Sequence, residues 1–226
     1  MISLSKRLRM AAELVPRCGL LADVGTDHAY LPVWLVQNQV SQRVLASDIG
    51  QGPLRRARET VEFYDLTDRV ETILADGLNY PQAEHAEVVT ICGMGGETMI
   101  SVLQAAPWTR EGRRIVLQPQ SKLPELEAWL QAHEYAVTAA KLCLDGGKLY
   151  LAMAVQGGGT WEQGAEAWLC SGRDSLFPVY LRRELDKTER ALSGLRQAQT
   201  EHAAALAAIE RRLAALKDFE REVKAW

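Results

Sequence analysis

Short apolar runs alternate with amphipathic stretches along most of the chain. Near the start, Leu4, Leu8, Ala12 and Val15 recur at helical spacing, and Pro16 ends that segment. Apolar runs bounded by turn residues predict strands at 20–24, 44–47, 70–75, 87–92 and 114–117. Helices are predicted between and after them at 29–37, from Gly52-Pro53 onward, at 97–105 and around 126–130. Strands that alternate with helices are typical of an α/β fold.

A β-hairpin is predicted to close this α/β region. Two apolar runs, 135–142 and 149–155, flank Asp145-Gly146-Gly147, and Asp-Gly between apolar runs is a hairpin signal. Parallel strands with crossover helices and a final antiparallel hairpin favour a doubly wound, Rossmann-like sheet. We therefore expect one α/β domain over 1–156.

The remainder of the chain is predicted to be helical. Gly157–Gly159 indicate a linker, after which two apolar stripes follow at helical spacing. They are Leu181, Leu185, Leu192 and Leu195, then Leu206, Ile209, Leu213, Leu216 and Val223. One straight helix over 178–226 would reach roughly 74 Å at ~1.5 Å per residue. We therefore expect a coiled-coil-like antiparallel hairpin in a second domain, 157–226, turning near Gln199 to His202; a continuous arm is the alternative.

Composition and charge narrow the class of protein. The 226 residues are 47% hydrophobic and 24% charged, which excludes a disordered chain, a collagen and a small disulfide scaffold. The four cysteines are too widely spaced for a metal or redox motif. No uncharged apolar run approaches the roughly 18 residues of a membrane span, and no signal-peptide core follows the basic start. We expect a cytoplasmic protein.

The net charge of -3 is distributed unevenly. Residues 18–177 carry 12 Lys and Arg against 20 Asp and Glu, whereas residues 1–17 carry 4 against 1 and residues 178–226 carry 10 against 8. Nucleic-acid binders usually show a basic footprint. Any such footprint here is local and built from the two ends of the chain.

Two carboxylates flank a glycine after the first predicted strand, in the segment Asp23-Val24-Gly25-Thr26-Asp27-His28-Ala29-Tyr30-Leu31-Pro32. Ligands of open α/β sheets bind at the carboxyl ends of the strands. Asp27 replaces the second glycine of the dinucleotide fingerprint, and Asp23 with Asp27 would repel a pyrophosphate. They suit a ligand that carries an ammonium and a sulfonium, as S-adenosylmethionine does. The alternative is a structural loop in which Asp27 caps the next helix.

The next two strand ends also carry carboxylates. Asp48, followed by Ile49, lies 23 residues after Gly25, close to the ~20-residue spacing of a ribose-binding acidic residue. Asp76-Gly77 follows the third strand, where a carboxylate can accept a hydrogen bond from an adenine amino group. A helix cap at Asp48 and a plain turn at Asp76-Gly77 are the alternatives.

Glycines and amides mark the ends of the fourth and fifth strands. Gly93-Met94-Gly95-Gly96 removes side chains where a flat substrate and a methyl donor would meet. A flexible turn is the alternative, although glycine loses the most entropy on ordering. Gln118-Pro119-Gln120 presents amides able to bond a base, with polar surface residues as the alternative.

Together and in this order, these segments resemble the tRNA (adenine-22-N1)-methyltransferase family, TrmK. Its Asp-x-Gly-x-Asp-His-Ala-x-Leu-Pro loop matches Asp23–Pro32, and its Gly-Met-Gly-Gly loop matches Gly93–Gly96. The opening Leu4–Leu8 and the hairpin at Asp145–Lys148 also fit. The family's Leu-Gln-Pro-Asn stretch reads Leu-Gln-Pro-Gln at Leu117–Gln120, so this chain departs from the family at its last amide.

The resemblance implies a class I S-adenosylmethionine-dependent methyltransferase that acts on N1 of adenosine 22 in bacterial tRNA. The implied cofactor-binding residues are Asp23, Gly25, Thr26, Asp27, His28, Leu31, Asp48, Ile49, Asp76, Gly77, Gly93 and Met94. The residues expected to meet the substrate are Gly95, Gly96, Gln118, Pro119, Gln120, Arg7, Arg182 and Arg183. No metal is expected.

The chemistry expected at this site needs little proton transfer. Adenine N1 has a free lone pair at neutral pH, so positioning can supply most of the rate of an in-line attack on the methyl group. We therefore expect Asp23 and Asp27 to act electrostatically or as cofactor ligands rather than as an obligate base. N1 lies on the Watson–Crick edge, so the target adenosine must be unpaired or flipped out.

Three other functions remain open from sequence. The same cofactor site would serve a small-molecule methyltransferase, with the C-terminal helices as a lid. A non-enzymatic scaffold would use those helices to recruit a partner. A nicotinamide-dependent oxidoreductase is disfavoured by the carboxylates of the first loop.

Overall fold

The computed structural model describes residues 1–197 and 203–226. Two compact units make up the described chain, Met1–Ala165 and Glu166–Trp226. The last strand of the first unit ends at Gly157, one residue beyond the predicted end of the α/β domain. No helix within the described ranges is long and apolar enough to cross a membrane.

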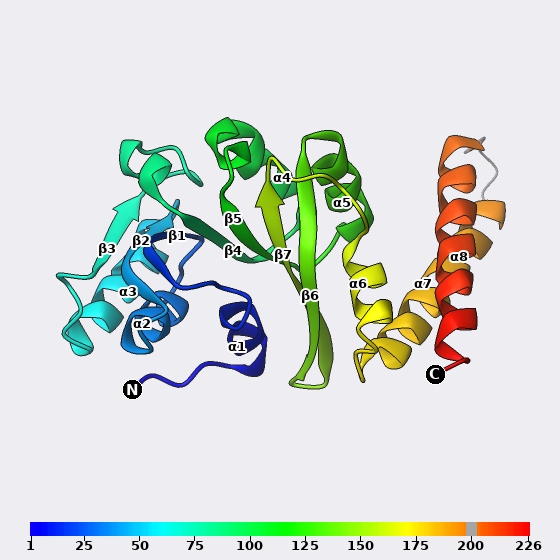
Figure 1. Ribbon diagram of the computed structural model, residues 1–226, viewed down its shortest axis with the longest axis horizontal. Helices are drawn as coiled ribbons and strands as arrows, with labels where there is room; N and C mark the ends of the chain where they lie inside the picture. Colours follow the sequence, from blue (N-terminus) through cyan, green and yellow to red (C-terminus); the bar gives the residue numbers. More distant parts are fainter. Residues whose placement is uncertain (198–202) are drawn as a thin grey trace. The chain divides into compact units, whose positions relative to one another are not determined.

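A seven-stranded sheet in the order β3-β2-β1-β4-β5-β7-β6 forms the centre of the first unit (Figure 1). The strands are β1 (Cys18–Val24), β2 (Ser41–Asp48), β3 (Val70–Leu74), β4 (Val88–Met94), β5 (Arg114–Pro119), β6 (Tyr135–Asp145) and β7 (Lys148–Gly157). The first five strands are parallel, and β7 runs antiparallel to both β5 and β6. The predicted Rossmann-like sheet with a closing hairpin is therefore confirmed.

Helices cover both faces of this sheet (Figure 1). They are α1 (Lys6–Ala12), α2 (Tyr30–Gln37), α3 (Gln51–Phe63), α4 (Gly96–Ala105) and α5 (Leu123–Ala132), with short 3-10 helices η1 (Pro81–His85) and η2 (Pro107–Arg110). The first three contact one another in sequence, and α4 packs with α5. Because parallel strands are covered on both faces, β1 and β4 read as near-continuous apolar runs, and Leu21 and Ile91 are fully buried.

The second unit is helical, as predicted. After α6 (Ala165–Ser171), α7 (Phe177–Gln197) packs against α8 (Ala203–Val223). Ion pairs between Arg196 and Glu210, 2.9 Å apart, and between Arg182 and Glu220, 4.0 Å apart, match the start of one helix with the end of the other. The antiparallel hairpin is confirmed, and the alternative of a continuous arm is wrong. The turn predicted near Gln199 to His202 lies outside the described residues.

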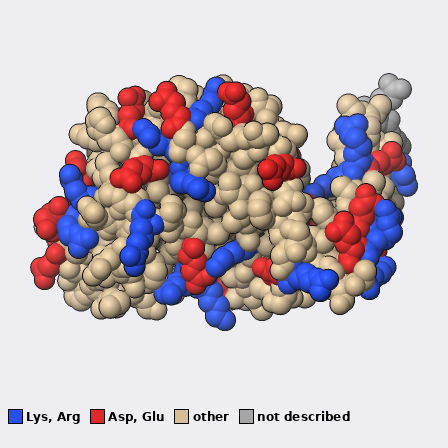
Figure 2. Space-filling view, viewed as in Figure 1, with Lys and Arg blue, Asp and Glu red and all other residues tan. Residues whose placement is uncertain are grey.

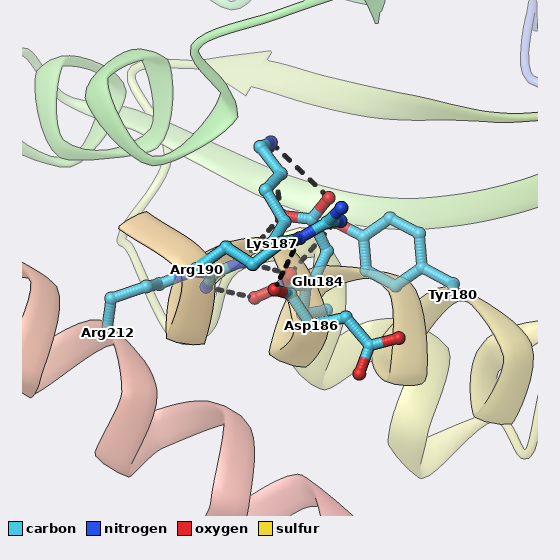
Figure 3. A network of polar contacts seen from close by, with 7 residues as sticks. Tyr180, Glu184, Asp186, Lys187, Arg190 and Arg212 are labelled. Carbon is cyan, nitrogen blue, oxygen red and sulfur yellow. Dashed lines mark hydrogen bonds and ion pairs between the residues drawn. The ribbon is translucent and has the colours of Figure 1, made fainter. Parts of the chain in front are cut away.

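A polar network around the buried Glu166 joins the helices of this unit, and Figure 3 shows part of it. The guanidinium of Arg212 from α8 forms a bidentate pair with the carboxylate of Glu166, whose side chain is 5% exposed. The Tyr180 hydroxyl donates to the same carboxylate at 2.9 Å, and the carboxylate of Glu184 lies 4.0 Å from Arg212. Arg212 is therefore paired with two carboxylates of its own unit.

Candidate functional site

Three of the predicted site loops meet at one edge of the sheet because β1, β2 and β3 are parallel neighbours. Val24 pairs with Ser47, and Asp48 pairs with Leu74, so the three strands end side by side. The loop that begins at Gly25 therefore lies beside Asp48, and the end of β2 separates it from the loop of Asp76. The backbone amide of Asp27 donates to Oδ2 of Asp48 at 3.3 Å.

Ser47 ties these loops together, and sequence reasoning missed it. Its backbone carbonyl accepts from the amides of Gly25 at 2.9 Å and Thr26 at 3.0 Å. Its hydroxyl donates to the carbonyl of Gly77 at 3.0 Å, and Ser47 is fully buried. The available signal was a small polar residue directly before Asp48 at the end of an otherwise apolar strand.

Asp23 is a buried carboxylate, 4% exposed, at the next-to-last position of β1, just before the loop. Thr90, its partner across β4, donates from Oγ1 to Oδ1 at 2.5 Å. Burial raises the pKa of Asp23 to about 6, because desolvation penalises the charged form more than the Thr90 hydrogen bond favours it; the nearby charge of Asp48 adds to the rise. The site therefore contains a carboxylate that gains from a cationic ligand.

Asp27 differs from Asp23 in its environment. Its side chain is 57% exposed, and its Oδ1 accepts from Nη2 of Arg56 at 2.6 Å. The N-cap of α2 is Ala29 in a left-handed conformation without a side-chain cap, so the alternative of Asp27 as helix cap is wrong. The ring of His28 stacks on Tyr30 with centroids 5.1 Å apart.

The other predicted cofactor residues divide by exposure. Oδ1 of Asp48 accepts from the amide of Gly50 at 2.8 Å, and Gly50 rather than Asp48 is the N-cap of α3. Ile49 is 71% exposed, and the side chain of Asp76 is also exposed. Leu31, by contrast, is buried, and its side chain packs in the hydrophobic core rather than toward solvent.

The glycine loop after β4 is pinned against the loop after β5. The amide of Gly96 donates to the carbonyl of Ser121 at 2.9 Å, and a Cβ on Gly96 would lie 2.5 Å from the carbonyl oxygen of Lys122. Met94 lies over the first loop, because a Cβ on Gly25 would meet its Cε at 2.2 Å. The loop therefore packs closely against the protein's own backbone at 121–122, and its approach to a ligand stays a prediction.

Arg7 joins this corner from the N-terminal helix. Its Nη1 donates at 2.8 Å to Oε1 of Gln118, which is fully buried, so the surface alternative is wrong for that amide. The backbone amide of Arg7 donates to Asp145 at 3.1 Å, and its guanidinium lies 5.7 Å from the centroid of the Tyr150 ring. Sequence reasoning assigned neither partner, because the hairpin was interpreted only as a turn.

The predicted substrate residues thus fall into two groups. One group, which includes Gly95, lies around the glycine loop, and Pro119 is the last residue of β5. A Cβ built on Gly93 would lie 3.6 Å from Nε2 of Gln120 and 3.3 Å from Nη1 of Arg7. Arg182 and Arg183 are exposed on α7 in the second unit. Within residues 1–197 and 203–226, no cluster of His, Cys, Asp and Glu could hold a metal ion, and all four cysteines are free.

Known proteins resemble this chain along most of its length. The methyltransferase-domain family matches residues 4–153. The tRNA (adenine(22)-N(1))-methyltransferase of Bacillus subtilis is 33% identical over 158 residues, which are 70% of this chain and 66% of that protein. A putative tRNA methyltransferase of Mycoplasma pneumoniae is 33% identical over 135 residues, 59% of this chain and 61% of that protein. The chain thus matches about two thirds of the length of these curated relatives.

Solved structures match more of the chain. The crystal structure of the Bacillus subtilis m1A22 tRNA methyltransferase TrmK superposes with a TM-score of 0.82 at 28% identity, covering 97% of this chain and 99% of that one. A putative tRNA (m1A22) methyltransferase of Streptococcus pneumoniae in complex with S-adenosyl-L-methionine has a TM-score of 0.80 at 28% identity, with the same coverage. The TrmK of M. capricolum in complex with S-adenosyl-homocysteine has a TM-score of 0.81 at 25% identity, also with that coverage.

Replacing Gly96 by alanine should destabilise the protein. The added Cβ would press on a backbone carbonyl, which has little room to move, and overpacking of this kind costs about 1–3 kcal/mol. Urea denaturation measures the change in unfolding free energy. Gly52→Ala is the matched control, because its nearest neighbour is a flexible arginine end 3.9 Å away. A Gly96→Ala protein as stable as wild type would show that the two loops are not packed as described.

Asp23→Asn should stabilise the ligand-free protein at pH 8. The pKa of this carboxyl is raised in the folded state, so ionisation of Asp23 lowers the stability of the folded protein. This stability cost is absent below the unfolded pKa of 3.8, grows as the pH rises from there, and is complete above about 6. At about 1.4 kcal/mol per pKa unit the penalty reaches roughly 3 kcal/mol. Denaturation of both proteins between pH 4 and pH 8 should show a stability gap that closes on acidification, and a constant gap would contradict the raised pKa.

Proposed function

The chain belongs to the tRNA (adenine-22-N1)-methyltransferase family within the methyltransferase-domain proteins, and we propose that it methylates N1 of adenosine 22 in bacterial tRNA. S-adenosylmethionine supplies the methyl group as a sulfonium electrophile. The observation that carries the proposal is a buried carboxylate, Asp23, and an exposed one, Asp27, on either side of the Gly25 turn. That arrangement favours a cationic ligand over a pyrophosphate.

The residues of this edge fit the three parts of such a cofactor. Asp23 and Asp27 would hold the ammonium and methionine end beside Gly25. Asp48 already accepts two backbone amides, and a carboxylate has about four acceptor positions, so it keeps capacity for ribose hydroxyls. Ile49 and Asp76 are exposed beside it and would border the adenine, the first as an apolar surface and the second as an acceptor.

The residues around the methyl-transfer point would position rather than deprotonate. N1 of adenine attacks without losing a proton, and the product base carries a positive charge. Asp23 and Asp27 would stabilise that charge through space. The positive guanidinium of Arg7 would repel the cationic product base, so Arg7 suits a phosphate or a base acceptor next to the target. Buried Gln118 holds the guanidinium in place. Gln118 therefore has a positioning role in this proposal.

The tRNA would also need contacts outside this edge. On the face drawn in Figure 2, basic and acidic side chains are interspersed, so docking would depend on local groups of arginines. Arg182 and Arg183 are adjacent and exposed on α7, and the carboxylate nearest to Arg182 is 4.0 Å away. A tRNA substrate would place this activity in the cytoplasm.

Methyl transfer from labelled S-adenosylmethionine to bulk bacterial tRNA tests the proposed function. We expect 1-methyladenosine at position 22, identified by nucleoside analysis and mapping. Cofactor binding with no labelled tRNA would overturn the tRNA substrate and favour a small-molecule acceptor in the same cofactor site.

The Asp27→Ala protein in the same assay tests the assignment of the first loop. We expect loss of cofactor binding, measured by calorimetry, together with loss of methyl transfer. Retained affinity with lost turnover would show that Asp27 acts in the chemical step instead.

Replacing Arg182 and Arg183 together by alanine should weaken tRNA binding several-fold and leave cofactor affinity unchanged. Loss of phosphate contacts should also lower the slope of log affinity against log salt by about one to two. Filter binding at several salt concentrations measures both effects. Arg221→Ala is the control, because Arg221 is paired with Asp218 on α8. An unchanged salt slope would exclude this pair from the docking surface.

A further inference from the structure

An open pocket of about 650 Å³ lies next to the candidate site on the α2 and α3 side of the first unit. The loop before α2 provides His28, α2 begins with Tyr30, and α3 provides Arg56 and Phe63. Ile2 and Ser3 also line the pocket. None of the cofactor contacts proposed above needs this volume, although His28 borders both regions.

The pocket displays aromatic rings to solvent. Phe63 is 78% exposed and Tyr30 is 42% exposed, so neither side chain gains much from burial in the protein. The His28 and Tyr30 rings are stacked at 21°, and Phe63 meets Tyr64 edge to face at 5.0 Å. Rings held in place with a free face are what unstacked nucleic-acid bases bind, with little dependence on base identity.

Arg56 supplies a cation with unused donor capacity in the same wall. Its Nη2 donates to Asp27 and its side chain is 42% exposed, and a guanidinium has five N–H donors. Glu59 also lines the pocket, and Arg55 lies 3.9 Å from its carboxylate, which offsets its charge. A base edge or a phosphate would give the Arg56 guanidinium a second acceptor.

The ion pair between Asp27 and Arg56 connects this pocket to the loop that would hold the methionine end of the cofactor. Extrusion of a target adenosine from its stack leaves the adjacent nucleotides without a stacking partner. We propose that this pocket binds a base of the tRNA next to the target adenosine, stacked on the exposed ring of Phe63. The inference rests on the proposed tRNA methyltransferase function.

Three substitutions at Phe63 separate stacking from general apolar contact. Phe63→Leu and Phe63→Ala should raise KM for tRNA about fivefold or more, which is the lower range for one base stacked on a ring. Phe63→Tyr keeps the ring and should retain the wild-type KM. In all three proteins kcat and the Kd for S-adenosylmethionine should stay within about twofold of wild type, because Phe63 touches neither reacting group in this proposal. Equal KM values for the leucine, tyrosine and wild-type proteins would overturn the proposal.

A second experiment changes the tRNA instead of the protein, so its main comparison does not require a protein variant to fold. Wild-type protein is given tRNA with an abasic nucleotide at each position flanking adenosine 22 in turn. One of the two should raise KM, and Phe63→Leu should add no further loss on that RNA. No effect at either position would overturn the pocket assignment while leaving the methyltransferase function intact. Failure of wild-type protein to methylate any tRNA would overturn both, so the two failures are distinguishable.

Discussion

The parallel pairing of β1 with both β2 and β4 is the constraint on which the site depends. It places Asp23 between two strands, opposite Thr90, and brings the ends of three loops to one edge. The contacts that then fix those loops are mostly backbone bonds, such as those to the carbonyl of Ser47. Glycine matters at this edge because neighbouring groups approach its backbone closely, as Met94 does over Gly25.

The burial of Asp23 lowers the stability of the ligand-free protein and favours the binding of a cation. In the ligand-free protein the carboxylate is buried, and its desolvation outweighs the hydrogen bonds from threonine side chains, so its charged form is unfavourable. A cation bound beside it would recover that cost as affinity. Asp27 is exposed and paired with Arg56, so it carries no comparable desolvation penalty, and its charge is partly offset. Two carboxylates in one motif thus have separate physical roles.

Much of the fold and part of the site could be predicted from the sequence. The spacing of apolar residues predicted the parallel strands, the hairpin and the helical second unit. A strand buried on both faces appears as a continuous apolar run, and a helix buried on one face appears as a periodic stripe. Contacts over long separations left no such pattern. Arg56 meets Asp27 and Arg7 meets Gln118 across 29 and 111 positions. The opposite exposures of Asp23 and Asp27 follow from strand pairing, which the local sequence does not specify.

The contact between Arg7 and Asp145 has a consequence for how the protein is made. The two residues are 138 positions apart, so α1 is synthesised well before the hairpin that it contacts. The corner that Arg7 completes therefore waits for nearly the whole first unit to be synthesised, and its closure is among the slow, nonlocal events of folding. A nascent chain can form β1 and β2 early, yet it gains its assembled substrate corner only when the hairpin returns to the first helix.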